Sequence, residues 1–258
     1  MDCKIRSFCF GEIMKNVFMT PEKMRFIYIF KNTLSMIDKE DVDNVVKNSA
    51  SFTGEDEITF IPKQFNTKIY LDNKDTFDKA MEMGDDVAIL NMASFKNAGG
   101  GVRIGCHAQE ECLCRRSNLY PVLKSFVYPL PMISTIYTPG ITIYKDSKYN
   151  LLPALRKCNV LSAAMCKLRQ DQQFTNEHAL LAKQKIEHLF RTALHFEQRR
   201  LVLGAWGCGA YRCPCDTMAK IFKIILESPE FKNQFEEICF AILDYQGRNY
   251  RAFAQQFS

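Results

Sequence analysis

Apolar residues recur along this chain at two spacings, and each spacing predicts one kind of element. In the carboxyl-terminal two-thirds, short apolar runs typical of strands alternate with longer stretches in which an apolar residue recurs every three or four positions, as in helices. This alternation predicts an α/β layer architecture. The strand-like runs cover residues 68–71, 87–90, 133–137, 141–144, 160–163, 201–203 and 238–243.

Two helices are predicted in the second half of the chain by stripes of apolar residues at helical spacing. The first covers residues 179–196, and the second begins at Asp216, which would act as its N-cap. We interpret both stripes as core-facing surfaces and not as cofactor contacts. Their members are Leu181, Ile186, Leu189, Phe190 and Ala193 in the first helix, and Met218, Ile221, Phe222 and Ile225 in the second.

The first sixty or so residues follow a different pattern. Thr20-Pro21-Glu22 is a good helix start, because threonine caps a helix and proline suits its first turn. Residues 38–48 and 51–57 are polar and predict connections. We therefore expect a helical extension over residues 1–62, packed on a domain of residues 63–258 and without a site of its own. The residues of its helix that could face a core are Met24, Ile27, Tyr28 and Leu34.

Composition is that of an ordinary globular protein. Of the residues, 47% are hydrophobic and 24% are charged. A chain of 258 residues is long enough to bury a substantial core. The net charge of +5 suits an anionic ligand, although a solvated surface explains it equally well. Basic residues are spread along the chain, so we expect no sequence-specific binding of nucleic acid.

Eleven cysteines are present, but no secretory leader pattern and no apolar run of membrane-spanning length accompanies them. Reduced thiols and an intracellular location, cytoplasmic or nuclear, are therefore expected, with no membrane association. The pairs Cys112/Cys114 and Cys213/Cys215 have the spacing Cys-x-Cys, which fits zinc poorly, so we predict no metal and no cofactor.

The most informative segment is the glycine-rich run from Gly99 to Glu111. It lies between the strand-like run at 87–90 and a helix-compatible stretch from about 108 to 117. Strand, glycine loop and helix in this order commonly present a phosphate or sugar-phosphate at the edge of an α/β sheet. A tight turn is the alternative for the glycines. The adjacent glutamates could merely complement the helix dipole, with Glu111 pairing to Arg115 four residues on.

The combination of segments resembles the microbial-type poly(ADP-ribose) glycohydrolases. The matching pieces are Leu90 to Ser94, the glycine triplet followed after a short spacer by Gln109-Glu110-Glu111, Leu113 to Ser117, the segment from Tyr137 to Asp146, and a second glycine cluster from Leu203 to Tyr211. Two features depart from the family pattern: Ala98 stands where proline is frequent, and Arg212-Cys213-Pro214-Cys215 replaces a small polar turn.

This resemblance implies a three-layer α/β/α macrodomain-like mixed sheet and an enzyme that hydrolyses ribose–ribose O-glycosidic bonds, releasing ADP-ribose from modified proteins. Glu111 would donate the proton to the leaving oxygen and then activate water, while Glu110 and Gln109 would position ribose hydroxyls. A helix amino terminus favours the carboxylate form of Glu111, so burial, Glu110 or the ligand must raise its proton affinity.

The remaining site residues implied by the resemblance are ligand contacts. Gly99, Gly100 and Gly101 would lie against the distal ribose and diphosphate. The backbone of Gly207, Cys208 and Gly209 would hold the diphosphate, and Tyr211 would stack on adenine. Asn91 either bonds a ribose or merely ends its strand, and Trp206 is either core or ligand contact.

Two other functions stay open at this point. A reader would bind ADP-ribose without cleaving it, although a reader has no need of Glu110 and Glu111. Alternatively, the enzyme would act on mono-ADP-ribosyl or acyl-ADP-ribose substrates. The expected partners are poly(ADP-ribose) or ADP-ribosylated proteins, bound by a monomer.

Overall fold

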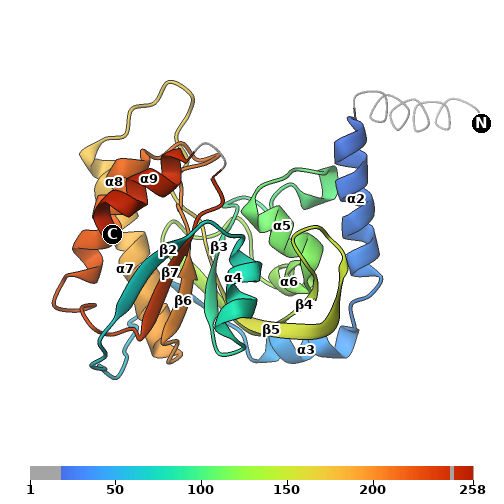
Figure 1. Ribbon diagram of the computed structural model, residues 1–258, viewed down its shortest axis with the longest axis horizontal. Helices are drawn as coiled ribbons and strands as arrows, with labels where there is room; N and C mark the ends of the chain where they lie inside the picture. Colours follow the sequence, from blue (N-terminus) through green and yellow to red (C-terminus); the bar gives the residue numbers. More distant parts are fainter. Residues whose placement is uncertain (1–18, 245–246, 258) are drawn as a thin grey trace, which may run out of the picture.

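The computed structural model describes residues 19–244 and 247–257. Its centre is a seven-stranded mixed sheet with the order β1-β4-β5-β3-β6-β7-β2 (Figure 1). β1, β4 and β5 pair antiparallel, whereas β5, β3, β6, β7 and β2 run parallel to one another. The strands are β1 (Ala50–Thr53), β2 (Lys68–Asp72), β3 (Ala88–Met92), β4 (Ser134–Lys145), β5 (Leu151–Ala163), β6 (Arg200–Leu203) and β7 (Glu237–Ala241).

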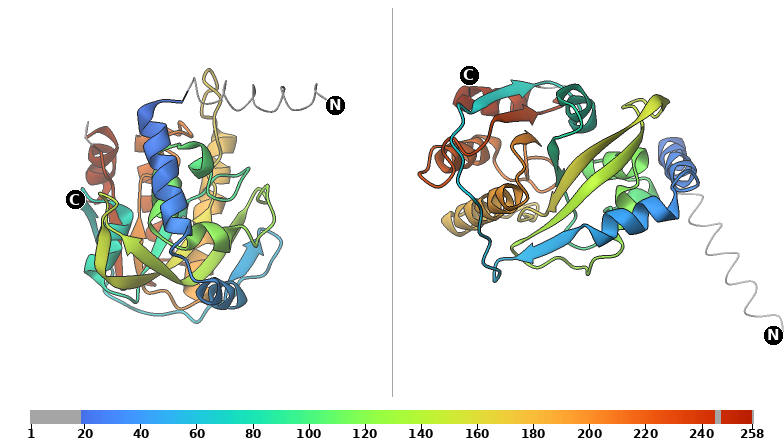
Figure 2. Two further views of the ribbon diagram at one scale, coloured as in Figure 1. Left: turned by 90° about the vertical axis from the view of Figure 1, so that its right-hand side faces the viewer. Right: turned by 90° about the horizontal axis from the view of Figure 1, so that it is seen from below.

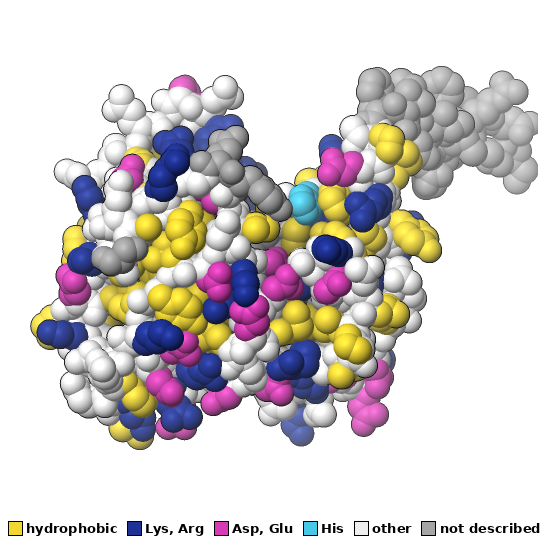
Figure 3. Space-filling view, in the orientation of Figure 1, with side chains coloured by type: hydrophobic (Ala, Val, Ile, Leu, Met, Phe, Trp, Pro, Cys, Tyr) yellow, Lys and Arg dark blue, Asp and Glu magenta, His cyan; other side chains and the backbone are white. Residues whose placement is uncertain are grey.

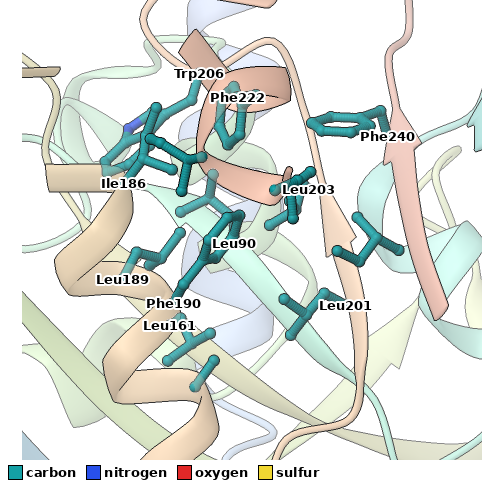
Figure 4. Close-up of a cluster of buried hydrophobic side chains, with 14 of the residues drawn as sticks. Leu90, Leu161, Ile186, Leu189, Phe190, Leu201, Leu203, Trp206, Phe222 and Phe240 are labelled. Atoms are coloured by element: carbon teal, nitrogen blue, oxygen red, sulfur yellow. The ribbon is translucent and has the colours of Figure 1, made fainter. Parts of the chain in front are cut away.

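Helices cover both faces of this sheet, because successive strand residues point to opposite sides. In β3, Leu90 packs into one core and Ile89 into the other. The first core lies under α7 (Asn176–His195), α8 (Cys215–Leu226) and α9 (Arg248–Phe257), and Figure 4 shows its centre around Leu90, Phe190 and Phe222. The second lies under α2 (Pro21–Leu34), α3 (Lys39–Lys47), α4 (Thr76–Met83), α5 (Gln109–Arg116) and α6 (Leu119–Leu123). The predicted three-layer macrodomain-like fold is confirmed.

Two predicted strands form a single one. The runs at 133–137 and 141–144 are both parts of β4, whose pairing with β5 shifts register between Thr138 and Ile141. Pro139 has no N–H group for the ladder and Gly140 has a φ of +66°, so a bulge interrupts the apolar pattern without ending the strand. α8 was predicted to be capped by Asp216, but its N-cap is Pro214 and Asp216 lies in the first turn.

The amino-terminal helix starts where predicted but presents a different face. Thr20 caps α2 by accepting a hydrogen bond from the N–H of Lys23. Phe26 and Phe30 are buried, whereas Met24 and Tyr28 are 47% and 73% exposed, so the predicted stripe was wrong. Phe26 and Phe30 lie four positions apart on the face of α2 that packs on α5, and Met24 and Tyr28 lie on the opposite face. Figure 2 shows α2 in front of the second helical layer.

The polar segments predicted as connections are regular elements. Residues 39–47 form α3, capped by the carboxylate of Asp38, and residues 50–53 form β1 at the edge of the sheet beside β4. Both are short, and in α3 the helical spacing of Val42, Val45 and Val46 stands among polar residues. The sheet thus takes one strand from residues 1–62, and the division of the chain at residue 63 remains a proposal.

The surface carries both signs of charge. Figure 3 shows Lys and Arg side chains interspersed with Asp and Glu over one face, without an extended area of one sign. Among the described helices, none is both long enough and apolar enough to cross a bilayer.

Candidate active site

Both glycine clusters lie at one edge of the sheet. β3 and β6 are parallel neighbours, with Ala88 opposite Leu201, and each cluster follows the carboxyl end of its strand. Parallel strands bring their carboxyl ends to a shared edge, where α/β proteins bind their ligands. The topology therefore brings together segments that lie a hundred residues apart in the chain.

The glycine triplet packs against other side chains of the protein at three points. Gly99 and Gly100 have φ angles of +68° and +55°, which residues with a side chain adopt only at an energetic cost. A Cβ on Gly99 would lie 2.6 Å from the ring of Tyr120, and one on Gly101 would collide with Cys106. A Cβ on Gly100 would lie 2.5 Å from Oε1 of Glu111 and 3.0 Å from Oε2 of Glu110. The triplet is thus a backbone cover over the two glutamates.

Glu111 is fixed by two backbone groups. Its Oε1 accepts from the N–H of Gly101 at 2.8 Å, and its Oε2 accepts from the N–H of Ala108 at 3.1 Å. Ala108 is the N-cap of α5, and Glu111 accepts from its backbone N–H three residues on, as the third residue of a capping box does. The side chain is buried yet borders the loop, which positions it to act on a ligand at the glycines.

Glu110 is buried more deeply, and its pKa is raised. Its Oε2 accepts from the N–H of Ser94 at 2.7 Å, and the residue is only 3% exposed. Burial, helped by the charge of Glu111, raises the pKa of Glu110 to about 8, against the opposing hydrogen bond from Ser94. With a pKa in this range, Glu110 is mostly protonated at neutral pH.

Polar atoms without partners gather around Glu110. Oε1 of Glu110, Oδ1 of Asn91 and the hydroxyl of Tyr128 are buried, and none has a hydrogen-bond partner among the described residues. Asn91 and Tyr128 both lie near enough to interact with the charge of Glu110. Burial raises the pKa of Tyr128, with the charge of Glu110 adding to the effect. Such atoms mark a site built for a ligand or water.

Gln109 links the strand to the helix. Its amide oxygen accepts from the N–H of Met92 at 2.8 Å, and its amide nitrogen donates to the carbonyl of Leu90 at 2.7 Å and to Thr76. Asn91 lies between the two clamped residues, and its side-chain nitrogen donates to Ser162 at 3.0 Å. Gln109 thus fixes the end of β3 against the start of α5, and its contact with a ribose stays a prediction.

The second cluster forms a turn after β6. Gly207 has a φ of +85°, and a Cβ there would lie 2.8 Å from Met165 and 3.0 Å from the sulfur of Cys213, whereas Gly209 faces open space. Cys208 between them is partly buried. Trp206 is almost fully buried in the first core, so it is a core residue (Figure 4). The binding of a diphosphate by this turn stays a prediction.

Tyr211 connects the two clusters directly. Its hydroxyl donates to the carbonyl of Ala93 and accepts from the N–H of Phe95, each at 3.2 Å. These residues flank Ser94, the residue that holds Glu110. Tyr211 is half-buried. Its hydroxyl stabilises the loop from Ala93 to Phe95, whose Ser94 donates a hydrogen bond to Glu110, and its stacking on adenine stays a prediction.

Two buried arginines of α5 hold the helix in place, a role that sequence reasoning missed. Arg115 donates to the carbonyl of Cys106 at 2.7 Å, and its guanidinium lies 4.5 Å from the ring centre of Phe26. Arg116 forms ion pairs with Asp75 and Asp78, each at 2.5 Å. No ion pair joins Arg115 to Glu111 within the described residues. The adjacency of both arginines to the glutamates was the available signal.

Two of the cysteine thiols lie close together. The sulfurs of Cys166 and Cys213 are 4.0 Å apart, which brings the loop after β5 next to the second glycine cluster. No three His, Cys, Asp or Glu side chains in residues 19–244 and 247–257 are grouped as the ligands of a metal ion would be.

The three-layer sheet, with a glycine loop covering paired glutamates and a glycine turn beside it, defines a macrodomain-like protein. Within this class, residues 23–146 match the family described as microbial-type PARG, catalytic domain, PARG being poly(ADP-ribose) glycohydrolase. The resemblance predicted from the sequence is thereby confirmed. No protein of curated function matches the chain in sequence.

Solved structures of this family share the fold. Poly(ADP-ribose) glycohydrolase from Thermomonospora curvata is 25% identical with a TM-score of 0.80, over 91% of this chain and 100% of that one. Its complex with the inhibitor ADP-HPD is 24% identical with a TM-score of 0.76, over the same shares. The enzyme from Deinococcus radiodurans, in complex with ADP-ribose, is 28% identical with a TM-score of 0.73, over 86% of this chain and 99% of that one.

Proposed function

We propose that this protein is a poly(ADP-ribose) glycohydrolase, which hydrolyses ribose–ribose O-glycosidic bonds and releases ADP-ribose from modified proteins. The observation that carries the proposal is the pair Glu110 and Glu111, buried beneath Gly100 at the carboxyl edge of the sheet. Burying two adjacent carboxyl groups is costly, and a protein that only binds ADP-ribose gains nothing from it. The match to the microbial-type catalytic domain supports the same conclusion.

The two glutamates provide the acid–base groups that hydrolysis of the glycosidic bond requires. Cleavage of the bond passes through an oxocarbenium-like state and needs a proton for the leaving oxygen and an activated water. Glu111 borders the loop and acts on the bond, first as acid and then as base. The raised pKa of Glu110 keeps that residue mostly neutral at pH 7, which reduces the repulsion between the two adjacent carboxyl groups.

The glycines and Tyr211 complete the site in this proposal. The distal ribose lies along Gly99, Gly100 and Gly101, and the diphosphate lies on the backbone of the turn that contains Cys208. Asn91, whose side-chain oxygen has no partner among the described residues, faces a ribose hydroxyl. We further propose that the protein acts as a monomer without a cofactor, in the cytoplasm or nucleus, as its many free thiols favour.

The test is incubation with poly(ADP-ribosyl)ated protein, followed by measurement of free ADP-ribose. Release that is lost in Glu111→Gln supports the hydrolase. Tight binding of ADP-ribose without any release would identify a reader. Protein carrying a single ADP-ribose and acyl-ADP-ribose, tested in parallel, show whether the bond between two riboses is the preferred one.

A further inference from the structure

A cavity borders the glycine loop at Gly100, the residue that also contacts the glutamates. It has a volume of about 380 Å³ and lies between the end of the loop and the region of α6. Its wall includes Gly100, Arg103, Tyr120, Lys124, Phe126 and Tyr128. None of these residues belongs to the second glycine cluster. The cavity is therefore separate from the turn to which we assign the diphosphate of the terminal unit.

Two contacts connect this cavity to the reacting pair. Gly100 lines the cavity, and a Cβ on Gly100 would be within contact distance of both glutamates, so this residue borders the cavity and the reacting pair alike. Tyr128 also lines the cavity, and its buried hydroxyl interacts with the charge of Glu110. A group held in the cavity is thus next to the bond on which the glutamates act.

The cavity is lined by two positively charged side chains, those of Arg103 and Lys124. Arg103 and Lys124 are exposed, and across the described chain neither side chain forms a hydrogen bond or an ion pair with another residue. Most buried or half-buried cations of this protein have partners, such as Arg116 with Asp75 and Asp78. Two unpaired cations at the mouth of one cavity suit a ligand with two negative charges, such as a diphosphate.

The cavity also offers aromatic surface. Tyr120, Phe126 and Tyr128 line it, and Tyr120 is held in place by an edge contact with Phe30, with ring centres 4.9 Å apart. Aromatic rings beside cations are the combination that binds a nucleotide, because the base stacks while the cations bind phosphate. A purely anionic ligand would not need the rings, and an apolar ligand would not need the cations.

We propose that this cavity binds the next ADP-ribose unit of the polymer, which is the leaving group of the reaction. This inference rests on the proposed function. The loop from Ala93 to Gly101 contacts Tyr211 at its beginning and the cavity at its end, with the glutamates between them. A terminal unit on the Tyr211 side thus places the second unit in the cavity. Preference for polymer over a single ADP-ribose follows.

The experiment compares two double variants. Arg103→Glu with Lys124→Glu reverses both charges of the cavity, and Lys39→Glu with Lys232→Glu makes the same change of net charge at exposed positions elsewhere. Both are made in the Glu111→Gln background, and calorimetry measures ADP-ribose and a short ADP-ribose oligomer. We expect the parent to bind the oligomer more tightly than ADP-ribose. The cavity variant should lose this advantage, about tenfold or more for two charge-assisted contacts, and keep its affinity for ADP-ribose.

The outcomes separate the two proposals. A parent that binds oligomer and monomer equally, or a cavity variant no weaker than the control variant, overturns the second subsite. A parent that prefers the oligomer while the protein with Glu111 intact releases no ADP-ribose overturns the hydrolase and leaves the subsite standing. Melting temperatures within a few degrees of the parent establish that the variants are folded.

Discussion

The carboxylate of Glu111 occupies the space that a side chain on Gly100 would need. A Cβ at that position would lie 2.5 Å from Oε1 of Glu111, and the φ of +55° adds strain for any residue but glycine. Position 100 thus governs the orientation of the carboxylate directly, and its effect on ligand binding comes second.

Gly100→Ala is therefore expected to lower turnover more than it lowers affinity for ADP-ribose. The methyl group displaces Glu111 from the N–H of Gly101, and misplacing a catalytic group is worth about a hundredfold in rate. Gly140→Ala is the matched control, since Gly140 has a φ of +66° with no atom near its Cβ position. The control should lose about 1–2 kcal/mol of stability and retain turnover. Equal turnover in the two variants would contradict the steric argument.

Glu110→Gln and Glu111→Gln should differ in effect. Glutamine resembles the neutral form of glutamate, which Glu110 adopts at neutral pH, so this variant keeps much of the geometry. Glutamine at 111 removes the group that transfers the proton, a loss of about 10²–10⁴-fold. Single-turnover assays on polymer at pH 7, with ADP-ribose affinity measured beside them, give the comparison. If Glu110→Gln is the more damaging change, the two roles are exchanged.

Stability should fall with rising pH because of Glu110. Its pKa is raised on folding from about 4.5 to about 8, so between these values the folded protein holds a proton that the unfolded chain releases. The stabilising contribution of that proton is complete below about pH 4.5 and is lost as the pH approaches 8. Relative to Glu110→Gln, the melting temperature of the parent should therefore decline from pH 5 to pH 8. Parallel curves for both proteins would show that Glu110 is ionised throughout.

Tyr211→Phe and Tyr211→Ala separate two functions of one side chain. Phenylalanine keeps the ring but loses the hydrogen bonds with Ala93 and Phe95, which costs about 1 kcal/mol of stability and loosens the loop that holds Glu110. Alanine also removes the ring, and stacking of a base on a ring is worth about 1–3 kcal/mol. ADP-ribose titration should show weakened binding in the alanine variant only. Normal affinity in both would place adenine elsewhere.

Much of the sheet was predictable because buried strands carry continuous apolar runs. β3 and β6 fall where those runs predicted them, and the glycines after them define the site. α3 and β1 were missed because both are short and rich in polar residues, and β1 depends on its pairing with a distant strand, β4. A local sequence pattern contains no information about such contacts.

The site was predictable in its residues but not in their states. The order of glycines and glutamates located Glu111 and Glu110, whereas the raised pKa of Glu110 arises from burial, which depends on the packed structure. The contacts by which Arg115 holds α5 in place could not be predicted either, because its partner Cys106 lies in a neighbouring turn and its partner Phe26 lies in a helix some ninety residues earlier.

The contact between α2 and α5 has a consequence for the order of synthesis. The hydroxyl of Thr33 donates to the carbonyl of Arg115, 82 residues later, and Phe26 packs on the same arginine. At about 5–20 residues per second, α2 is synthesised roughly 4–16 seconds before its partner. During that interval the aromatic side chains of α2, Phe26 and Phe30, have no partner surface to cover them. Nascent chains halted before residue 116 should be cut by protease near Phe26 and Phe30, and completed chains should resist. The synthesis of α5, the helix that carries the glutamates, thus ends the period in which α2 is open to proteolysis.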